Sequence, residues 1–475
     1  MHQALLESST PTPAPPAACD AQASAAAVVP EPGEEVLAQS GYGLAARVVM
    51  ATSRGLALVL VSRALGPAAF GAYSIVIASY SVFNGLATLG LDQAHVYSMS
   101  TEKRDAATVL RNVTWLSLVL GCTAAAALWG AVSLLRESIF DGVPTLAIAV
   151  TAAAFPAILA HNFTNGMLLG RGRFRTHGTV EAGKWILHLA LVVGLAVTGH
   201  ITILSAAVAL YAPIAAAGVV YTFMLMRSEG IAPRRLLGRP SWSEGRHALH
   251  FGVRSGLANV AHVLHMRLDV YLLKYFADAA MVGRYALAVS MTDVLLYAGR
   301  SVGAVAFASR ASTRRRPGSD TVAATRTLVL LVGVAGLVIF LFAAPAVRIL
   351  FGAQYDESVT AVYFRLPGLL LESAALVLTG DLLARAALRP LFLSNLLAVV
   401  VGFVANLLVI PAGGMAGAAA VFSGASLVRS AALAAAHARS SARTGADYVR
   451  FSWADLRRVL VLGKKRRRAK VGCGS

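Results

Sequence analysis

Apolar runs of about 20 residues recur along most of the chain, and they restrict its fold more than any other feature. Each run is long enough to cross the hydrocarbon core of a bilayer as a helix. The chain is 57% hydrophobic and 14% charged, whereas soluble domains are about 45–50% apolar and about 25% charged. We therefore predict an all-α integral membrane protein with about 12 transmembrane helices. The predicted spans cover roughly 42–62, 71–97, 112–135, 144–169, 178–198, 201–226, 251–276, 282–308, 327–347, 357–383, 390–411 and 414–436.

Positive charge in the connections alternates from one side of the predicted membrane to the other. Cytoplasmic loops of membrane proteins retain Lys and Arg. Connections after odd-numbered spans hold only Arg63, Arg136 and Arg348, whereas those after even-numbered spans hold basic clusters. This alternation predicts that both termini are cytoplasmic. Most of the basic residues behind the net charge of +19 lie in short clusters between the apolar runs and in the C-terminal tail, with no basic domain that could form a groove for nucleic acid.

The two ends of the chain differ from the spans in composition. Residues 1–40 are rich in Ala, Pro and Ser and contain no Lys or Arg, which predicts a disordered cytoplasmic extension rather than a signal peptide. Residues 437–475 form a polybasic cytoplasmic tail, in which apolar residues from Val449 to Leu460 recur at helical spacing. An amphipathic helix on anionic lipid and a solvated tail both fit this pattern.

Two sequence patterns occur twice at nearly the same separation. "FGAYSIVIA" at 70–78 matches "VGRYALAVS" at 282–290, and "LLGRGRFR" at 168–175 matches "LLARAALR" at 382–389. The offsets are 212 and 214 residues. Parallel repeats of this kind are related by an axis along the membrane normal. We therefore predict two six-helix halves, 41–226 and 251–436, which surround a central cavity and are joined by a basic linker, 227–250.

Three stretches of the chain resemble a family of transporters. "SRALGPAAFGAYSIVIASYSVFNGLATLGLDQA" at 62–94 resembles the first-to-second-span signature of bacterial O-antigen and exopolysaccharide flippases. These flippases belong to the multidrug/oligosaccharidyl-lipid/polysaccharide (MOP) exporter superfamily. "RLDVYLLKYFADAAMVGRYALAVSMTD" at 267–293 and "VANLLVIPAGGMAGAAAV" at 404–421 resemble later spans of the same proteins. The resemblance implies an inner-membrane flippase of undecaprenyl-pyrophosphate-linked oligosaccharide that works with polysaccharide polymerase machinery.

Five arginines inside the predicted spans are candidates for substrate binding. Each would cost about 2.5–3.5 kcal/mol facing lipid, so most must face water or a partner. The first and seventh spans are equivalent in the two halves, and together they would make a cationic cavity. Guanidinium binds phosphate bidentately, and the resemblance implies a diphosphate substrate. The candidates are Arg47, Arg54, Arg254, Arg267 and Arg300.

Other polar residues inside the spans have more than one interpretation. Asp269, Asp293 and Glu372 are candidates for an ion-coupling site or a gate. Lys274, Arg284 and Arg429 lie near span ends, where long side chains reach the interface. Glu181 and Lys184 are spaced to pair on one helical face. His161, Asn162 and Asn165 of the fourth span are expected to form hydrogen bonds between helices. Asp92, Arg365 and Asp381 have two interpretations, gate salt bridges or polar contacts between helices.

No catalytic or metal-binding motif is found in the sequence. It contains no phosphate loop, no G-x-S-x-G turn and no Cys/His metal spacing, and its three cysteines are scattered. We therefore expect a transporter without a cofactor, driven by a proton or sodium gradient, rather than an enzyme. A lipid II flippase and a drug/cation antiporter of the same superfamily remain alternatives. So does a membrane-embedded glycan polymerase or ligase, which would need a long periplasmic loop that the predicted topology lacks.

Overall fold

The computed structural model describes residues 34–441 except 101, 103, 237, 301, 304–318 and 386. For 34–45, 251, 254, 255, 319 and 320 it describes the backbone alone. Most of the predicted N-terminal extension and nearly all of the polybasic tail, with its amphipathic segment, therefore lie outside the described residues. Within them the chain forms α-helices and short 3-10 turns and no strand, so the predicted all-α class is confirmed.

Most of the described helices are joined by short connections, as expected for antiparallel membrane spans. Three 3-10 turns lie between them: η1 (Pro233–Arg235), η2 (Asp293–Leu295) and η3 (Ala353–Tyr355). The α-helices are α2 (Glu34–Thr88), α3 (Leu91–Ser100), α4 (Ala106–Leu134), α5 (Thr145–Gly170), α6 (Phe174–Val197), α7 (Ile203–Ser228), α8 (Trp242–Phe276), α9 (Ala279–Thr292), α11 (Ser319–Leu350), α12 (Ser358–Ala384) and α13 (Leu388–Ser441).

Helices α2 and α13 each contain two spans joined by a bend at a glycine. They are 55 and 54 residues long, which would extend about 80 Å as straight helices, far beyond the roughly 30 Å hydrocarbon core. Gly66 interrupts α2 with φ 69° and Gly414 interrupts α13 with φ 51°, conformations that glycine adopts without a steric penalty. Pro67 then starts the second part of α2, where its missing N–H costs no hydrogen bond.

The described helices account for the predicted number of spans. Nine of the described helices are long and apolar enough to cross a membrane, and the bent α2 and α13 are among them. Helix α8 is 35 residues long and matches the seventh predicted span. It falls outside this set of nine because it carries charges along its length, including Arg267 and Asp269. Counting each bent helix as two spans gives the twelve predicted from the sequence.

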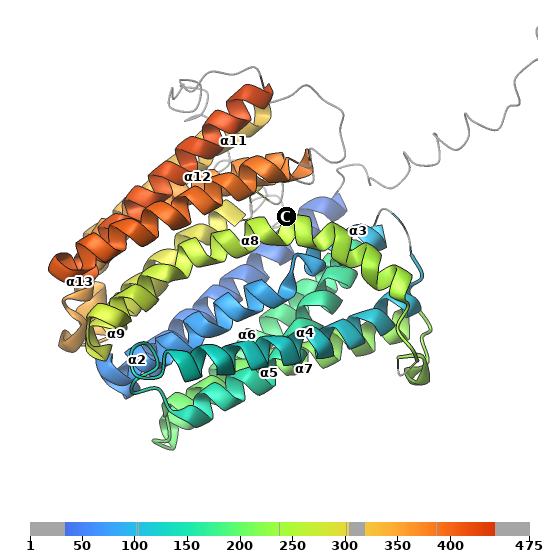
Figure 1. Cartoon of the computed structure of the whole chain (residues 1–475), viewed down its shortest axis with the longest axis horizontal. Helices are drawn as coiled ribbons and strands as arrows, with labels where there is room; N and C mark the ends of the chain where they lie inside the picture. Colours follow the sequence, from blue (N-terminus) through green and yellow to red (C-terminus); the bar gives the residue numbers. More distant parts are fainter. Residues whose placement is uncertain are drawn as a thin grey trace, which may run out of the picture.

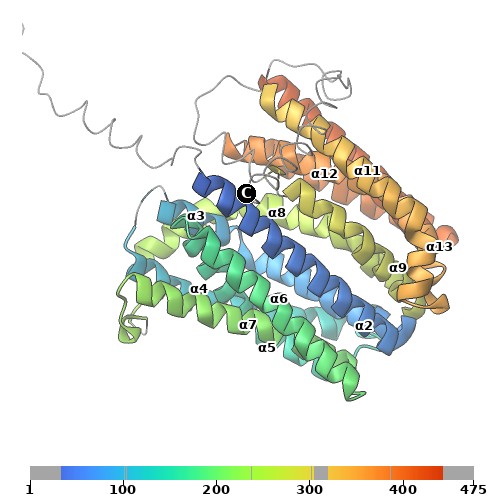
Figure 2. The same ribbon diagram turned by 180° about the vertical axis from the view of Figure 1, so that it is seen from behind.

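The helices form two halves that meet along α2, α8 and α9. Figures 1 and 2 show α4 to α7 on one side of the molecule and α11 to α13 on the other, with α2, α8 and α9 between them. We call the end of the molecule that carries the bends at Gly66 and Gly414 the bend end, and the end that carries the linker the linker end. The charge alternation predicts that the bend end faces outside.

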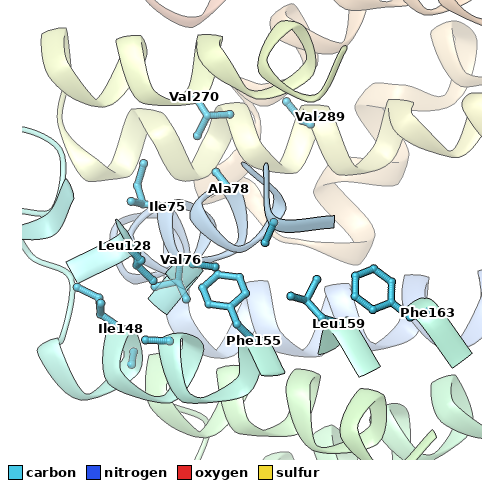
Figure 3. Packing of buried hydrophobic residues seen from close by; sticks show 14 of the residues in the cluster. Ile75, Val76, Ala78, Leu128, Ile148, Phe155, Leu159, Phe163, Val270 and Val289 are labelled. Atoms are coloured by element: carbon cyan, nitrogen blue, oxygen red, sulfur yellow. The ribbon is translucent and has the colours of Figure 1, made fainter. Parts of the chain in front are cut away.

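Apolar side chains of α2 fill the space between the halves. Figure 3 shows Ile75, Val76 and Ala78 of α2 between Phe155 of α5 and the valines of α8 and α9. All three α2 residues are buried, and Ile75 is 0% exposed. The second half of α2 therefore packs against both halves of the molecule and forms part of the wall between them.

Contacts at two equivalent glycines support the repeat. A Cβ atom on Gly166 of α5 would lie 2.5 Å from the carbonyl oxygen of Asp92, and one on Gly380 of α12 would lie 2.2 Å from that of Gly303. These glycines are 214 residues apart, the offset of the second sequence repeat. In both halves a helix of the repeat therefore approaches its neighbour closely at a glycine without a side chain in between.

Polar contacts attach the linker to the first half. Arg104 contacts Glu244 at 2.5 Å, His247 contacts Glu102 at 3.0 Å, and Asn112 donates to the Ser241 carbonyl at 2.9 Å. Burial would raise the pKa of Glu102, but hydrogen bonds and charges from Arg104 and His247 outweigh it and lower the pKa. The start of α8 is thus held against the loop between α3 and α4.

Cysteine labelling will test which end of the molecule faces outside. In a variant whose three cysteines are replaced by serine, we expect an impermeant thiol reagent added to intact cells to label Glu137→Cys, in the bend-end loop. It should not label Ser243→Cys, in the linker, until the cells are lysed. Both positions are exposed in the structure, so accessibility reports the membrane side. Labelling of Ser243→Cys in intact cells would contradict the predicted orientation.

Candidate functional site

A cavity of about 500 Å³ lies between the two halves. The first half contributes side chains from α2, α5, α6 and α7, and the second half contributes α8 and α9 with the turn that follows. This volume is within the range of about 300–1,000 Å³ typical of ligand pockets. Its charged and aromatic lining residues include Arg54, Tyr73, Tyr80, His161, Lys184, Trp185, His188, Arg267, Asp293 and Tyr297.

Arg54 of α2 lies between two aromatic rings. Its guanidinium carbon is 4.4 Å from the ring centre of Trp185 on α6 and 5.4 Å from that of Tyr297, which follows η2. It also donates a hydrogen bond to the Tyr297 hydroxyl. Trp185 packs edge-on against His188, whose Nδ1 lies 2.9 Å from the Ala209 carbonyl oxygen of α7. These contacts join the first half, through Arg54, to the second half, through Tyr297.

A buried cluster lies behind Lys184 in the first half. Lys184 Nζ lies 2.7 Å from a carboxylate oxygen of Glu181, which confirms the predicted pair. His161 Nε2 lies 3.0 Å from the same carboxylate, and the Tyr221 hydroxyl of α7 lies 3.2 Å from it. Lys184 and Glu181 are both 8% exposed. The ammonium that reaches the cavity is therefore balanced by a carboxylate directly behind it.

The hydrogen bonds predicted for the fourth span are present. Besides His161, Asn162 of α5 donates to Asn84 of α2 at 3.0 Å, and Asn165 contacts His177 of α6 at 2.7 Å. These side chains join three helices of one half. His161 and Asn162 also line the cavity, so their interhelical role does not remove them from the site.

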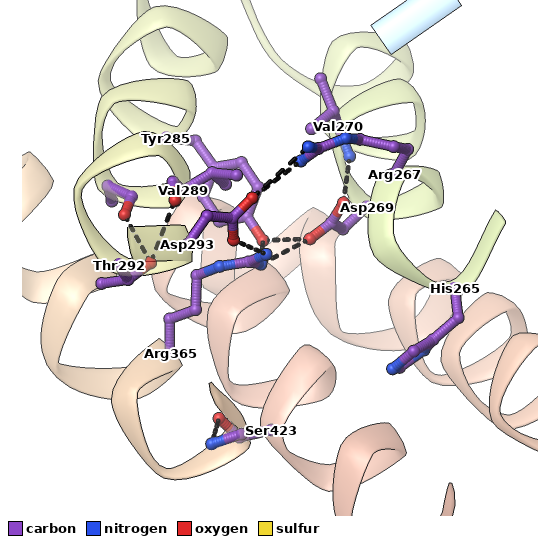
Figure 4. A network of polar contacts seen from close by, with 12 residues as sticks. His265, Arg267, Asp269, Val270, Tyr285, Val289, Thr292, Asp293, Arg365 and Ser423 are labelled. Atoms are coloured by element: carbon purple, nitrogen blue, oxygen red, sulfur yellow. Dashed lines mark hydrogen bonds and ion pairs between the residues drawn. The ribbon is translucent and has the colours of Figure 1, made fainter. Parts of the chain in front are cut away.

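Arg267 forms the cavity end of a chain of ion pairs in the second half (Figure 4). Its guanidinium lies 3.3 Å from Asp293 Oδ2, and Asp293 Oδ1 lies 3.3 Å from Arg365 on α12. Arg365 also contacts Asp269 at 3.0 Å, and Tyr285 donates a hydrogen bond to Asp269. Two arginines and two aspartates thus balance one another. Asp293 lies at η2, where α9 gives way to a 3-10 turn.

A second buried pair lies farther from the cavity. Arg429 of α13 contacts Glu372 of α12 at 2.6 Å, and His265 of α8 contacts the same carboxylate at 3.0 Å. The prediction that Arg429 reaches the membrane interface is wrong, because its side chain is 1% exposed. A partner 57 residues away on the neighbouring helix neutralises it. All three residues belong to the second half, so this pair is a contact between helices of one half rather than a gate between halves.

The structure places the eight candidate residues in different surroundings. Arg54, Arg267 and Asp293 line the cavity, whereas Asp269 and Glu372 are buried in ion pairs behind the cavity wall. Arg47 and Arg300 are exposed and lie outside the described lining. Arg300 follows Tyr297, the last lining residue along its helix, by almost one turn. Arg254 lies outside the residues whose side chains the structure describes.

Sequence reasoning missed Trp185, His188 and Tyr297 as lining residues. The sequence held a signal for Trp185 and His188. With Glu181 and Lys184 they occupy positions i, i+3, i+4 and i+7 of α6, which lie on one face of a helix. A polar stripe of this kind in a membrane helix faces the protein interior. Tyr297 gave no such signal, because tyrosine is common where membrane helices meet water.

Comparisons with known proteins give a family and a fold. The family described as "Polysaccharide biosynthesis protein" matches residues 60–360. A structure of the lipid II flippase MurJ in an inward closed conformation has a TM-score of 0.65 and 13% identity, covering 89% of this chain and 93% of that one. An inward-facing multidrug resistance MATE transporter of the MOP superfamily has a TM-score of 0.63 and 17% identity, covering 87% and 96%.

A third solved structure matches a similar share of this chain. It is a MOP superfamily transporter from Pyrococcus furiosus, whose description notes a reversed polarity of its binding pocket. Its TM-score is 0.58 at 15% identity, with 89% of this chain and 94% of that chain covered. No curated protein sequence matches the chain. At these identities the solved structures show the fold alone.

Proposed function

Because the chain belongs to the polysaccharide biosynthesis family of the MOP exporter superfamily, we propose that it flips an undecaprenyl-pyrophosphate-linked oligosaccharide across the bacterial inner membrane. The diphosphate and the first sugars would occupy the cavity while the prenyl chain stays in lipid. Rocking of one half against the other would expose the cavity to each side in turn. The product would enter O-antigen or exopolysaccharide synthesis, with polymerase machinery as a partner.

The charge of the cavity carries this proposal. Three basic side chains, Arg54, Lys184 and Arg267, line the described part of the cavity, whereas Asp293 is the one acidic residue there. A cavity with low-dielectric walls and one predominant sign concentrates ligands of the opposite sign. An anionic headgroup therefore fits this site, and a cationic drug does not.

The same site argues against two of the three rival functions. A drug/cation antiporter would need acidic residues to hold its substrate, and Asp293 is already paired with Arg267 at 3.3 Å. A lipid II flippase shares the diphosphate chemistry, so only a comparison of glycans separates it from the proposal. A polymerase or ligase needs a catalytic constellation at a membrane surface, and the charged groups described here lie instead around a cavity between helices.

An ion gradient would drive transport, and Asp293 is our candidate for its coupling site. Among the three carboxylates predicted for this role, Asp293 lines the described cavity, whereas Asp269 and Glu372 lie behind its wall. Asp293 also lies at η2, where the span changes its helical geometry. Protonation of its carboxylate would loosen its ion pairs with Arg267 and Arg365 at this turn.

Flipping by the purified protein tests the proposal. We expect proteoliposomes with the wild-type protein to translocate a fluorescent prenyl-diphosphate-linked oligosaccharide, measured by the fraction that becomes accessible to an external quencher. Arg54→Ala should lower the affinity about ten- to hundredfold, because a hydrogen bond to a charged group contributes about 1.5–3 kcal/mol. Arg54→Lys should recover only part of the loss, since lysine keeps the charge without the bidentate fork.

Arg284→Ala is the matched control for this experiment. Arg284 is also an in-span arginine, but it pairs with the exposed Glu357 at the bend end and does not line the cavity. Its substitution should leave translocation near the wild-type rate. Efficient translocation of lipid II but not of other lipid-linked glycans would favour the alternative function, a lipid II flippase. Normal translocation by Arg54→Ala would refute a diphosphate site in this cavity.

A further inference from the structure

The basic side chains of the cavity are not equivalent in charge. Lys184 is balanced by Glu181 at 2.7 Å, and Arg267 is balanced by Asp293 at 3.3 Å. Among the described residues, no carboxylate lies within ion-pair distance of Arg54, which contacts two aromatic rings instead. A doubly charged anion that enters the cavity therefore meets one cation whose charge is not already compensated.

The contacts of Arg54 leave its hydrogen-bond donors available. The contact with Trp185, with the guanidinium carbon 4.4 Å from the ring centre, is a cation–π contact and uses none of the five N–H donors in a conventional hydrogen bond. The Tyr297 hydroxyl accepts from Nη1, and Arg54 is otherwise exposed to the cavity. Trp185 itself is supported by His188, which contacts the Ala209 carbonyl oxygen. The aromatic contacts thus hold the fork in one orientation without occupying most of its donors.

We propose that Trp185 and Tyr297 are positioning residues that hold the Arg54 guanidinium as the diphosphate ligand, and that Arg267 is not a ligand. Arg267 instead ends the neutral chain of ion pairs through Asp293 to Arg365. This inference rests on the proposed function, because it assigns the diphosphate of that substrate to one side of the cavity. Arg54 and Arg267, which the sequence analysis placed together as substrate ligands, therefore have different roles: Arg54 binds the diphosphate and Arg267 belongs to the ion-pair chain.

Binding of farnesyl diphosphate to the purified full-length protein tests this assignment by calorimetry. Trp185→Leu removes the stacking surface and should weaken binding about five- to thirtyfold, the range of a partly desolvated cation–π contact. Trp185→Phe keeps an aromatic face and should recover much of the affinity. Tyr297→Leu removes the second ring and the hydroxyl that contact Arg54, so it should also weaken binding.

Replacing Arg267 and Asp293 together by neutral residues distinguishes the role of Arg267 from that of Arg54. The double variant Arg267→Gln, Asp293→Asn removes both charges together and should retain farnesyl diphosphate binding, whereas Arg54→Gln should weaken it about ten- to hundredfold. Loss of binding in the double variant, with an unchanged elution profile, would show that Arg267 is a ligand and overturn the assignment. Unchanged affinity in Trp185→Leu would overturn the positioning role alone.

Tryptophan fluorescence gives a second measurement on the same variants. Ligand bound to Arg54 would lie beside Trp185, so farnesyl diphosphate should change the emission of the wild type. Trp185→Phe should bind without that change, although the other tryptophans remain. An emission change that persists in Trp185→Phe would contradict the assignment. If the wild type binds no prenyl diphosphate at all, the proposed function itself fails and the inference fails with it.

Discussion

Leucine at Gly283 will keep the two halves from closing at the bend end. A Cβ atom on Gly283 would lie 1.9 Å from the Pro67 carbonyl oxygen and 2.9 Å from the Gly71 amide nitrogen. A Cβ atom on Gly71 would lie 1.9 Å from the Ala279 carbonyl oxygen. The two glycines are repeat equivalents, 212 residues apart. The halves therefore meet here backbone to backbone, and any side chain must separate them.

A larger side chain at this contact shifts the balance between conformations. Overpacking costs typically about 1–3 kcal/mol, and about 1.4 kcal/mol changes an equilibrium tenfold. We expect Gly283→Leu to increase the bend-end-open population about ten- to hundredfold and to stop transport. The Tyr355 hydroxyl, which donates to the Ser62 carbonyl at 2.9 Å, would separate in the same movement.

Accessibility of the cavity measures this shift. Ser290 lines the cavity on α9, and Ser290→Cys in the cysteine-free background can be labelled from outside only when the bend end is open. Labelling should be much faster with Gly283→Leu than without it. Gly130→Leu is the control, because nothing lies within 4 Å of a Cβ at Gly130 on α4. Equal labelling rates with and without Gly283→Leu would show that this contact does not limit opening.

Loss of Arg365 will remove the protein from the membrane rather than slow its transport. The Arg365 side chain is 0% exposed and contacts Asp269 at 3.0 Å and Asp293 at 3.3 Å. Its guanidinium also lies 3.7 Å from the ring centre of Phe422. Removing one partner of a buried ion pair typically costs about 3–5 kcal/mol, because the other charge is left uncompensated. A loss of this size is a large fraction of total stability.

Abundance and thermal stability must be measured on the same preparations. We expect Arg365→Ala to yield little monodisperse protein after detergent extraction. Arg284→Ala, which breaks a pair with the 62% exposed Glu357, should change stability by only about 0–1 kcal/mol. Adding Asp269→Asn to Arg365→Ala should restore part of the yield by removing the orphaned charge. A stable but inactive Arg365→Ala protein would mean that Arg365 acts in transport instead.

Side-chain partners were predicted well only where they are close in sequence. The Glu181–Lys184 pair followed from their spacing, because residues three apart share a helix face. Arg267 and Asp269 do not pair with each other, as their spacing implied, but their actual partners lie on η2 and α12. Arg54 and Trp185 come from different helices of one half. Which of these residues meet depends on how the helices rotate and pack.

The sequence by itself determined the number of spans and the division into repeats. Backbone polar groups cannot remain unpaired in lipid, so long apolar runs must form helices. The structure added that α2 and α13 each hold two spans and bend at Gly66 and Gly414. Only the tertiary structure decided which in-span charges face the cavity. Arg54 and Arg429 have the same chemistry in the sequence, yet one lines the cavity and the other is buried against Glu372. Long-range packing sets that difference, because a charge in a span is stable either in water or beside a partner.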